Sequence, residues 1–278
     1  MKKALFALLI IVFLSSACAQ TPVKKPNLPE TAQQQQNQPA PVPLDSNNVQ
    51  KYANRFPGKL GLYAKNLKTG QTISINSDEI FATASTHKLV VALAVYKYIY
   101  PNVSVEKKKD YDQMIKKMMI ISDNPSFYEL LDEIEQRHPD ALTKVLKDLN
   151  LTKTRIHSKE AFHRYGYHSV TTPQEMAVVF ETIYNEQYLG KEMSAILKEE
   201  LAKTIYKEEI PRHMGNNKVM HKVGQLPDGV LNDVGIVDDG KNLILISSFS
   251  KTQQSPDYAS NFLAELSAKS YEALRNKN

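Results

Sequence analysis

Ser85 and Lys88 lie three residues apart at the start of a long apolar run, and their types and spacing suit nucleophilic catalysis. Residues i and i+3 share one face of a helix, so the Lys88 amine can lie against the Ser85 oxygen. Such an amine can accept the proton of a hydroxyl that is a poor nucleophile unaided. On the alternative interpretation Ser85 only caps the helix. The two roles are compatible, because a helix N-terminus favours developing negative charge.

The triplet Ser122-Asp123-Asn124 follows a second apolar helical stretch. Ser122 can pass a proton to a leaving nitrogen, and Asn124 can hold Lys88 and a substrate amide. Asp123 is expected to brace the loop. Taken alone, the triplet is more typical of a simple turn and helix cap.

The third motif, Lys222-Val223-Gly224, ends a strand-like run that begins at residue 218. From a strand edge Lys222 can attract a substrate carboxylate, and Gly224 lets the strand approach a ligand closely. Val223 has no hydroxyl with which to bind that carboxylate. No Arg stands shortly after the motif to supply a charge in its place, and Leu231 lies in that region.

In this order the three motifs resemble the Ser-x-x-Lys, Ser-Asp-Asn and Lys-Thr-Gly set of class A β-lactamases and penicillin-binding proteins. The resemblance covers the chain from about Asn48 to the C-terminus. It implies an α/β lobe and a helical lobe with the site between them. It also implies an oxyanion hole formed by the backbone N–H groups of Ser85 and Gln225. The chain departs from the set at Val223, where Thr or Ser is usual.

Glu160 distinguishes the enzyme types within this resemblance. Class A enzymes use a Glu in an omega loop to activate the water that releases the acyl-enzyme, and Thr154-Arg155-Ile156 resembles the entry to that loop. After Glu160 the match fails, because His163-Arg164 replaces the usual Leu-Asn and the loop is short. Glu160 is therefore either the deacylating base or a surface glutamate in a flexible loop.

The pattern of elements predicts an α/β (α+β) fold, with an antiparallel sheet made from both ends of the chain, flanking helices and an inserted all-helical lobe. Alternation and turn residues predict strands at 60–64, 72–75, 218–222, 232–237 and 243–250. Helical periodicity predicts helices at 45–56, 85–100, 111–121, 124–134, 140–149, 173–184, 191–206 and 256–274. Residues 152–172 have no clean period.

Composition excludes several classes of function. The apolar fraction of 42% and the charged fraction of 23% are ordinary for a globular domain. Basic residues are interspersed with acidic ones, so we expect no nucleic-acid partner. The histidines lack metal-ligand spacing, so we expect neither a metal nor another cofactor. We expect a monomer that acts on a small β-lactam or a peptidoglycan-like substrate.

The N-terminus reads as an export signal. Met1–Lys3 is a charged start, and the apolar stretch 4–14 is too short to span a bilayer. Cys18, the single cysteine, ends this segment like a bacterial lipobox, so we expect a signal peptide at 1–18 with a lipid on Cys18. Ordinary cleavage nearby is the alternative. The Pro- and Gln-rich stretch 19–43 predicts a disordered tether, which leaves 44–278 as the folded domain.

These inferences favour an exported, lipid-anchored serine β-lactamase of class A type, held at a bacterial membrane, with Ser85 forming the acyl-enzyme. The alternative is a penicillin-binding peptidoglycan carboxypeptidase or transpeptidase, or a related serine hydrolase, without efficient deacylation. A non-catalytic binding lipoprotein on the same fold is a third hypothesis, since a fold does not fix a function.

Overall fold

The structure of the protein is a computed structural model, and it describes residues 46–276. The expected signal peptide, the lipidated Cys18 and the tether at 19–43 lie outside the described residues. Those expectations stay predictions.

A five-stranded antiparallel sheet is built from both ends of the described chain, as the sequence predicted. Its strand order is β2-β1-β7-β6-β5, so β5 forms one edge. The strands are β1 (Gly58–Asn66), β2 (Thr72–Ile75), β5 (Lys218–Leu226), β6 (Val230–Asp238) and β7 (Leu243–Thr252). β2 has its predicted bounds, whereas the other four strands extend beyond theirs at one or both ends, where the turns between them add backbone pairs.

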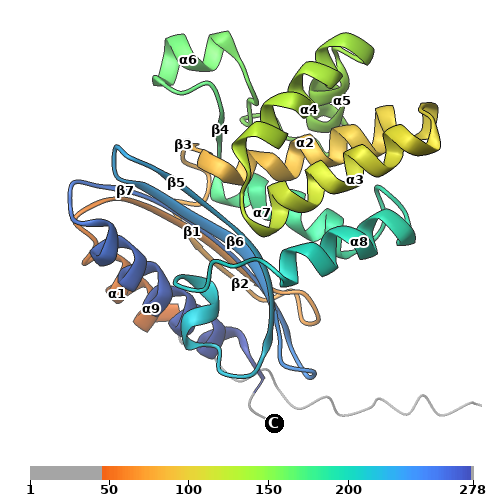
Figure 1. The fold of residues 1–278 in the computed structure, drawn as a ribbon. Coiled ribbons are helices and arrows are strands. Elements are labelled where there is room, and N and C mark those ends of the chain that lie inside the picture. The colour runs from red at the N-terminus through yellow and green to blue at the C-terminus, as the bar shows by residue number, and fades with distance from the viewer. Residues whose placement is uncertain (1–45, 277–278) are drawn as a thin grey trace, which may run out of the picture. The chain divides into compact units, whose positions relative to one another are not determined.

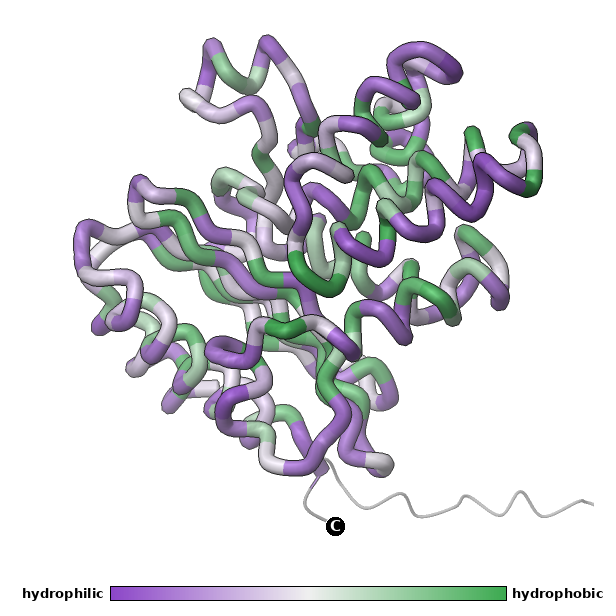
Figure 2. The backbone as a smooth tube through the Cα atoms, in the orientation of Figure 1, coloured by the Kyte–Doolittle hydropathy of each residue, from purple (hydrophilic) through white to green (hydrophobic). Residues whose placement is uncertain are grey.

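Helices cover both faces of this sheet (Figure 1). α1 (Ser46–Ala53) and α9 (Pro256–Leu274) pack together on one face. α7 (Pro173–Tyr184) and α8 (Lys191–Ala202) contact the other face. Successive side chains of a strand point to opposite faces, so β1, β5, β6 and β7 each contribute to two apolar clusters. In Figure 2 green segments run along the strands and the inner helices, whereas the outer turns are mainly purple.

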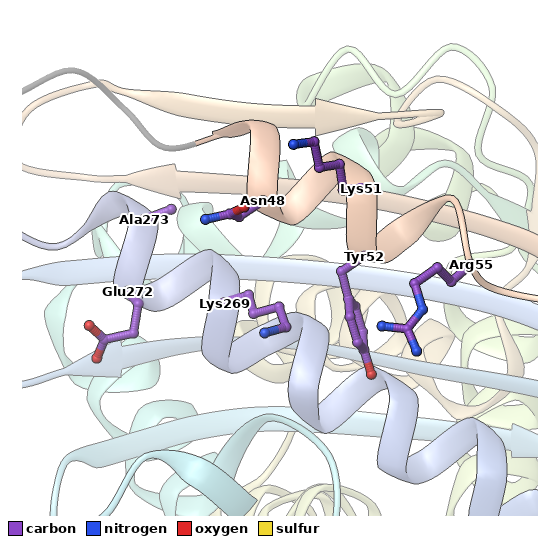
Figure 3. Close-up of a pocket in the computed structure, with 7 residues that line it drawn as sticks. All are labelled: Asn48, Lys51, Tyr52, Arg55, Lys269, Glu272 and Ala273. Carbon is purple, nitrogen blue, oxygen red and sulfur yellow. The ribbon is translucent and has the colours of Figure 1, made fainter.

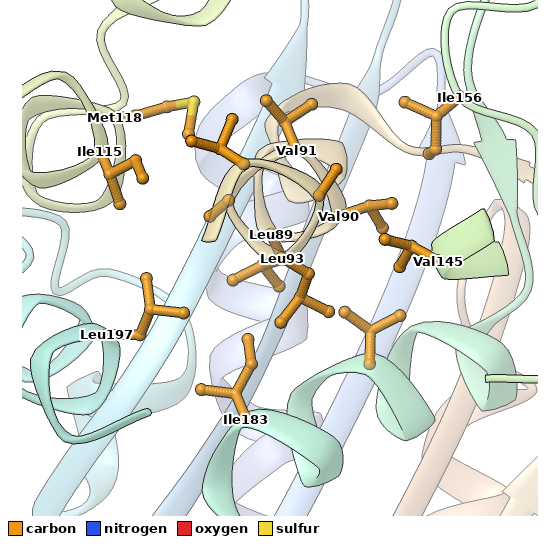
Figure 4. Packing of buried hydrophobic residues seen from close by; sticks show 14 of the residues in the cluster. Leu89, Val90, Val91, Leu93, Ile115, Met118, Val145, Ile156, Ile183 and Leu197 are labelled. Atoms are coloured by element: carbon orange, nitrogen blue, oxygen red, sulfur yellow. The ribbon is translucent and has the colours of Figure 1, made fainter. Parts of the chain in front are cut away.

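The helical lobe is inserted between the first and last strands of the sheet, and α2 (Lys88–Ala94) lies at its centre. Every residue of α2 is buried, as expected for a helix that is apolar nearly all round. Around it pack α3 (Val105–Ile120), α4 (Asn124–Arg137) and α5 (Ala141–Asp148). Figure 4 shows side chains from several of these elements meeting around Leu89 and Leu93. This packing fixes the helix that carries Lys88.

Several predicted boundaries differ from those observed. The predicted helix 85–100 is divided into η1 (Ala84–His87), α2, η2 (Val95–Ile99) and η3 (Tyr100–Asn102). α8 ends at Ala202, before the predicted end at residue 206. The remaining short elements are β3 (Phe81–Ala82), β4 (Val170–Thr171) and η4 (Ile210–His213).

The region 152–172, which has no clean period, contains the helix α6 (Lys159–Tyr165). The Ser158 side chain accepts a hydrogen bond from Ala161 N and caps its start. Gly166, at φ 78°, ends it in the left-handed conformation. Seven residues are too few for periodicity to reveal a helix, although both caps were present in the sequence. Among residues 46–276 no helix is long and apolar enough to cross a membrane.

Candidate active site

Ser85 lies in the turn η1, half-buried, where the chain passes from β3 into α2. Ala84, just before it, has φ 45°, in the left-handed region that a non-glycine residue adopts at a cost of about 1–3 kcal/mol. Asn232 of β6 stabilises this turn, because its Nδ2 donates to the carbonyls of Ala82 at 2.8 Å and Thr83 at 3.1 Å. The hydrogen bonds from Asn232 thus stabilise the strained backbone that positions Ser85.

The Lys88 amine is buried and points at the Ser-Asp-Asn turn. Its Nζ donates to Ser122 O at 2.5 Å, to Asn124 Oδ1 at 2.7 Å and to Ser122 Oγ at 3.2 Å. Burial lowers the Lys88 pKa to about 8, against the opposing charge of Asp123. Among the hydrogen bonds of residues 46–276, none joins this amine to the Ser85 hydroxyl. Three oxygens of the neighbouring turn already take its donors.

Lys222 approaches the same hydroxyl from the sheet. It is fully buried, and its Nζ donates to Ser122 Oγ and to Val223 O, both at 2.9 Å. Burial, followed by the charge of Lys88, lowers the Lys222 pKa to about 7. Since Ser122 Oγ accepts from two lysines, its own hydrogen remains to be donated to another group.

Two features of the Ser122 turn explain how it holds this position. Ser122 itself has φ 57°, between the end of α3 and the start of α4. Asp123 accepts a hydrogen bond from Ser126 N at 2.8 Å, which caps α4 and braces the loop as expected. Asn124 therefore enters the first turn of α4 with its side chain directed at Lys88.

Gly224 brings the edge strand against the backbone of Ser85. A Cβ at Gly224 would lie 2.7 Å from Ser85 N and 3.0 Å from Thr83 O, so only glycine fits here. Gln225 follows at the exposed end of the strand. This approach is the one that the predicted pair of backbone donors, on Ser85 and Gln225, requires.

Glu160 is not brought to this cluster. It lies exposed in the first turn of α6 and lines a surface pocket with Thr152 and Arg155. Within the described part of the chain Glu160 makes no hydrogen bond or ion pair. The loop after α6 is instead attached to the β5–β6 turn, because the Tyr167 hydroxyl donates to Asp228. Lys251 of β7 also donates to Asp228, at 3.0 Å. The role of Glu160 stays a prediction.

Sequence reasoning missed several residues that shape the site. Asn232 holds the turn before Ser85. In the sequence it could be noticed only as a polar residue at an inward-facing position of a strand. His221 lies beside Lys222 and is fully buried, with Nδ1 2.9 Å from Asp233 Oδ1. His87 stacks on the Phe127 ring at 4.3 Å. These contacts join segments far apart in the sequence, so spacing does not reveal them.

Five surface pockets of the described residues contain none of Ser85, Lys88, Ser122 and Lys222, although Glu160 lines two of them and Gln225 lines another. The pocket drawn in Figure 3 lies between α1 and α9 and is lined by Lys51, Tyr52 and Lys269, among others. No group of three or more His, Cys, Asp or Glu side chains within 46–276 could hold a metal ion. The candidate active site is therefore the cluster formed by Ser85, Lys88, Ser122 and Lys222.

The family model of the beta-lactamase enzyme family matches residues 46–102 and 99–274. The chain belongs to this family. Its mixed helix and antiparallel-sheet fold is that of class A β-lactamases. No curated protein matches the chain by sequence.

The fold is similar to several solved β-lactamase structures of low sequence identity. An ancestral class A β-lactamase of Gram-negative bacteria has a TM-score of 0.71 at 21% identity, covering 82% of this chain and 99% of that one. A β-lactamase from Sphaerobacter thermophilus has a TM-score of 0.70 at 17% identity, covering 84% and 98%. The TLA-1 extended-spectrum β-lactamase has a TM-score of 0.71 at 18% identity, covering 83% and 99%.

Proposed function

We propose that this protein is a serine β-lactamase of class A type that opens the lactam amide through an acyl-enzyme on Ser85. One observation carries the proposal: the Ser122 hydroxyl bridges the amines of Lys88 and Lys222 beside a serine held in a strained turn. This arrangement provides a nucleophile, a proton acceptor and a proton donor within one cluster. Membership of the beta-lactamase enzyme family supports the substrate class.

In the proposed acylation, neutral Lys88 accepts the Ser85 proton as Oγ attacks the lactam carbonyl. The carbonyl oxygen becomes an oxyanion that the backbone N–H groups of Ser85 and Gln225 stabilise; such donors contribute about 3 kcal/mol each. The C–N bond then breaks, Ser122 donates its proton to the leaving nitrogen, and the proton on Lys88 restores the Ser122 hydroxyl. An ester on Ser85 and an opened ring result.

Deacylation needs a water molecule and a base. In the class A scheme Glu160 takes a proton from water, the hydroxide attacks the ester, and Ser85 leaves with the proton restored. For this step α6 has to fold back over the site. The exposed position of Glu160 favours the alternative function, a penicillin-binding or other serine hydrolase that acylates readily and deacylates slowly.

A β-lactamase and a penicillin-binding protein differ in how long the acyl-enzyme on Ser85 persists. The protein is incubated with a penicillin, and its intact mass is followed over time. Rapid loss of the adduct with release of the opened product supports a β-lactamase, whereas a lasting adduct supports a penicillin-binding function. Absence of any adduct contradicts both.

Glu160→Ala tests the deacylation step. If Glu160 is the base, the variant acylates normally and its steady rate falls about 10²–10⁴-fold, with a burst followed by a slow phase. Glu192→Ala, which removes a glutamate from the first turn of α8, is the matched control. Turnover at the wild-type rate would show that Glu160 is a surface residue and that deacylation proceeds by another route.

We also propose that the protein is exported and lipid-anchored through Cys18. The charged start, the short apolar stretch and the single cysteine support this localisation. Full-length protein made in a bacterium should partition with membranes, and Cys18→Ser should send it to the soluble exported fraction. Wild-type protein that is wholly soluble, begins at Ala19 or later and lacks acyl mass would overturn the proposal.

A further inference from the structure

The segment 203–209, between α8 and η4, passes from one face of the sheet to the other. α8 packs on the face that α7 also covers, whereas η4 packs against α9 on the opposite face (Figure 1). The segment therefore goes around β5, the edge strand that carries Lys222. It belongs to no helix or strand, so its position depends on contacts with neighbouring elements.

His221 of β5 holds this segment from the interior. Its ring is fully buried, with Nε2 2.9 Å from Tyr206 O and Nδ1 2.9 Å from Asp233 Oδ1. Since a carbonyl oxygen can only accept, Nε2 carries a hydrogen and donates it to Tyr206 O. Asp233 Oδ2 in turn accepts from Ile210 N at 3.0 Å. The His221–Asp233 pair thus binds the chain at Tyr206 and again at the start of η4.

Gly235 of β6 leaves room for the His221 side chain. The two residues pair directly across the β5–β6 ladder, and a Cβ at Gly235 would lie 2.4 Å from both His221 Cβ and Met220 O. A larger residue at this position would displace His221 from its partners. The packing of the two strands therefore constrains where the ring lies.

The same segment contacts the turn that carries Ser122. Ile205 N donates to Ile120 O at 3.1 Å, and the Tyr206 hydroxyl donates to Ile121 O at 3.1 Å. These two carbonyls belong to the residues just before Ser122, whose φ of 57° lies in the left-handed region. The segment therefore holds the backbone that leads into the proposed proton donor.

We propose that His221 is a positioning residue for the proton-donating hydroxyl of Ser122, and that it acts through Tyr206 rather than on the substrate itself. The inference rests on the proposed function, because it assigns a role in acylation. Asp233 orients the ring, Nε2–H fixes the Tyr206 carbonyl, and the Tyr206 hydroxyl fixes the carbonyl of Ile121. Loss of a contact in this series lets the turn move, and a displacement of about 1 Å can slow a reaction on the order of 10²-fold.

Tyr206→Phe tests the series at a surface residue. Tyr206 is 36% exposed, so loss of its hydroxyl should change the melting temperature by no more than about 2 °C. We expect the rate at which benzylpenicillin labels Ser85, measured by intact mass, to fall about fivefold or more, because Ile121 O loses its donor. Tyr258→Phe, 37% exposed on α9, is the matched control and should be labelled at the wild-type rate.

Two substitutions of His221 separate positioning from stability. A Gln amide reaches about as far as Nε2, so His221→Gln keeps a donor for Tyr206 O and leaves the buried Asp233 without its charged partner. An Asn amide reaches about as far as Nδ1, so His221→Asn keeps a donor for Asp233 and frees Tyr206 O. We expect the Gln variant to be the less stable one and yet to be labelled within about threefold of the wild-type rate. The Asn variant should be labelled about tenfold more slowly or worse.

The outcomes distinguish this inference from the proposed function. A wild-type rate for Tyr206→Phe, or an equal fall in Tyr258→Phe, would overturn the inference and leave the proposed function intact. Labelling of the two His221 variants that follows their stability would do the same, and Tyr206→Phe decides the question if neither of them folds. Wild-type protein that benzylpenicillin labels no more than Ser85→Ala would overturn the proposed function and this inference with it.

Discussion

At the scale of single residues, the chemistry depends on how burial alters two lysines. Lys88 and Lys222 both donate to Ser122 Oγ, and two ammonium groups so close repel each other. Burial lowers the pKa of Lys88 to about 8, and burial followed by the charge of Lys88 lowers the pKa of Lys222 to about 7. An amine whose pKa lies this close to physiological pH is partly neutral there and can serve as a base, which an ordinary surface lysine cannot do.

The pH dependence of acylation follows from the lowered pKa of Lys88. The reactive form is the neutral amine, so acylation should rise with pH, by about tenfold per unit below pH 7, and level off above about pH 8. The measurement is the rate of covalent labelling between pH 5.5 and 9.5, with an uncharged ester as substrate to remove any effect of carboxylate binding. A rate that does not change with pH over this range would exclude Lys88 as the base.

At the scale of elements, the site forms where an edge strand meets a helix start. β5 contributes Lys222 and Gly224 on the face that meets η1, because side chains two residues apart share a face. β6 contributes Asn232, which fixes the carbonyls before Ser85. Ser122 reaches the same place from the turn between α3 and α4.

Gly224→Ala tests the contact between β5 and η1. The added Cβ would lie 2.7 Å from Ser85 N, and backbone atoms cannot yield without separating β5 from η1. We expect acylation to fall at least tenfold, since backbone donors that are misplaced stabilise an oxyanion poorly. Gln225→Ala leaves the backbone N–H in place and should acylate nearly normally. Acylation by Gly224→Ala at the wild-type rate would show that this contact does not shape the site.

The sequence predicted the parts of the site that depend on local spacing. Ser85 and Lys88 share a helix start, and the alternating pattern of the last strands placed the edge that carries Lys222. Contacts between distant segments left no local signal: Asn232 with Ala82, and the direction of the Lys88 amine toward Ser122. Glu160 fell in a stretch with no period, so its position depended on how a short, capped helix packs.

At the scale of the whole molecule, the helical lobe contains a buried carboxyl that opposes folding at high pH. Glu200 of α8 is 8% exposed, and within the described residues its Oε2 has no hydrogen-bond partner. Burial, followed by the nearby charge of Asp112, raises its pKa to about 8. The folded state therefore holds a proton that the unfolded chain releases near its ordinary pKa of 4.5. Stability should fall as pH rises from about 4.5 through 8.

Glu200→Gln removes this dependence of stability on pH while keeping the shape of the side chain. We expect the free energy of unfolding to rise by about 1–3 kcal/mol at pH 8.5, with little change at pH 5, as measured by urea unfolding at both values. Glu199→Gln is the control: its carboxyl is exposed and paired with Lys203, so the change should stay within about 0.5 kcal/mol. Equal effects of the two substitutions would contradict the assignment of a protonated, buried Glu200.

The proposed function depends above all on Ser85 being the nucleophile of a covalent acyl-enzyme. Its most direct test is the intact mass of the wild-type protein and of Ser85→Ala after exposure to a β-lactam or its methyl ester, followed by mapping of the labelled peptide. We expect one adduct per wild-type chain, located on Ser85, and none on a Ser85→Ala variant whose unfolding curve matches that of the wild type. Undiminished labelling of Ser85→Ala at another serine would contradict it.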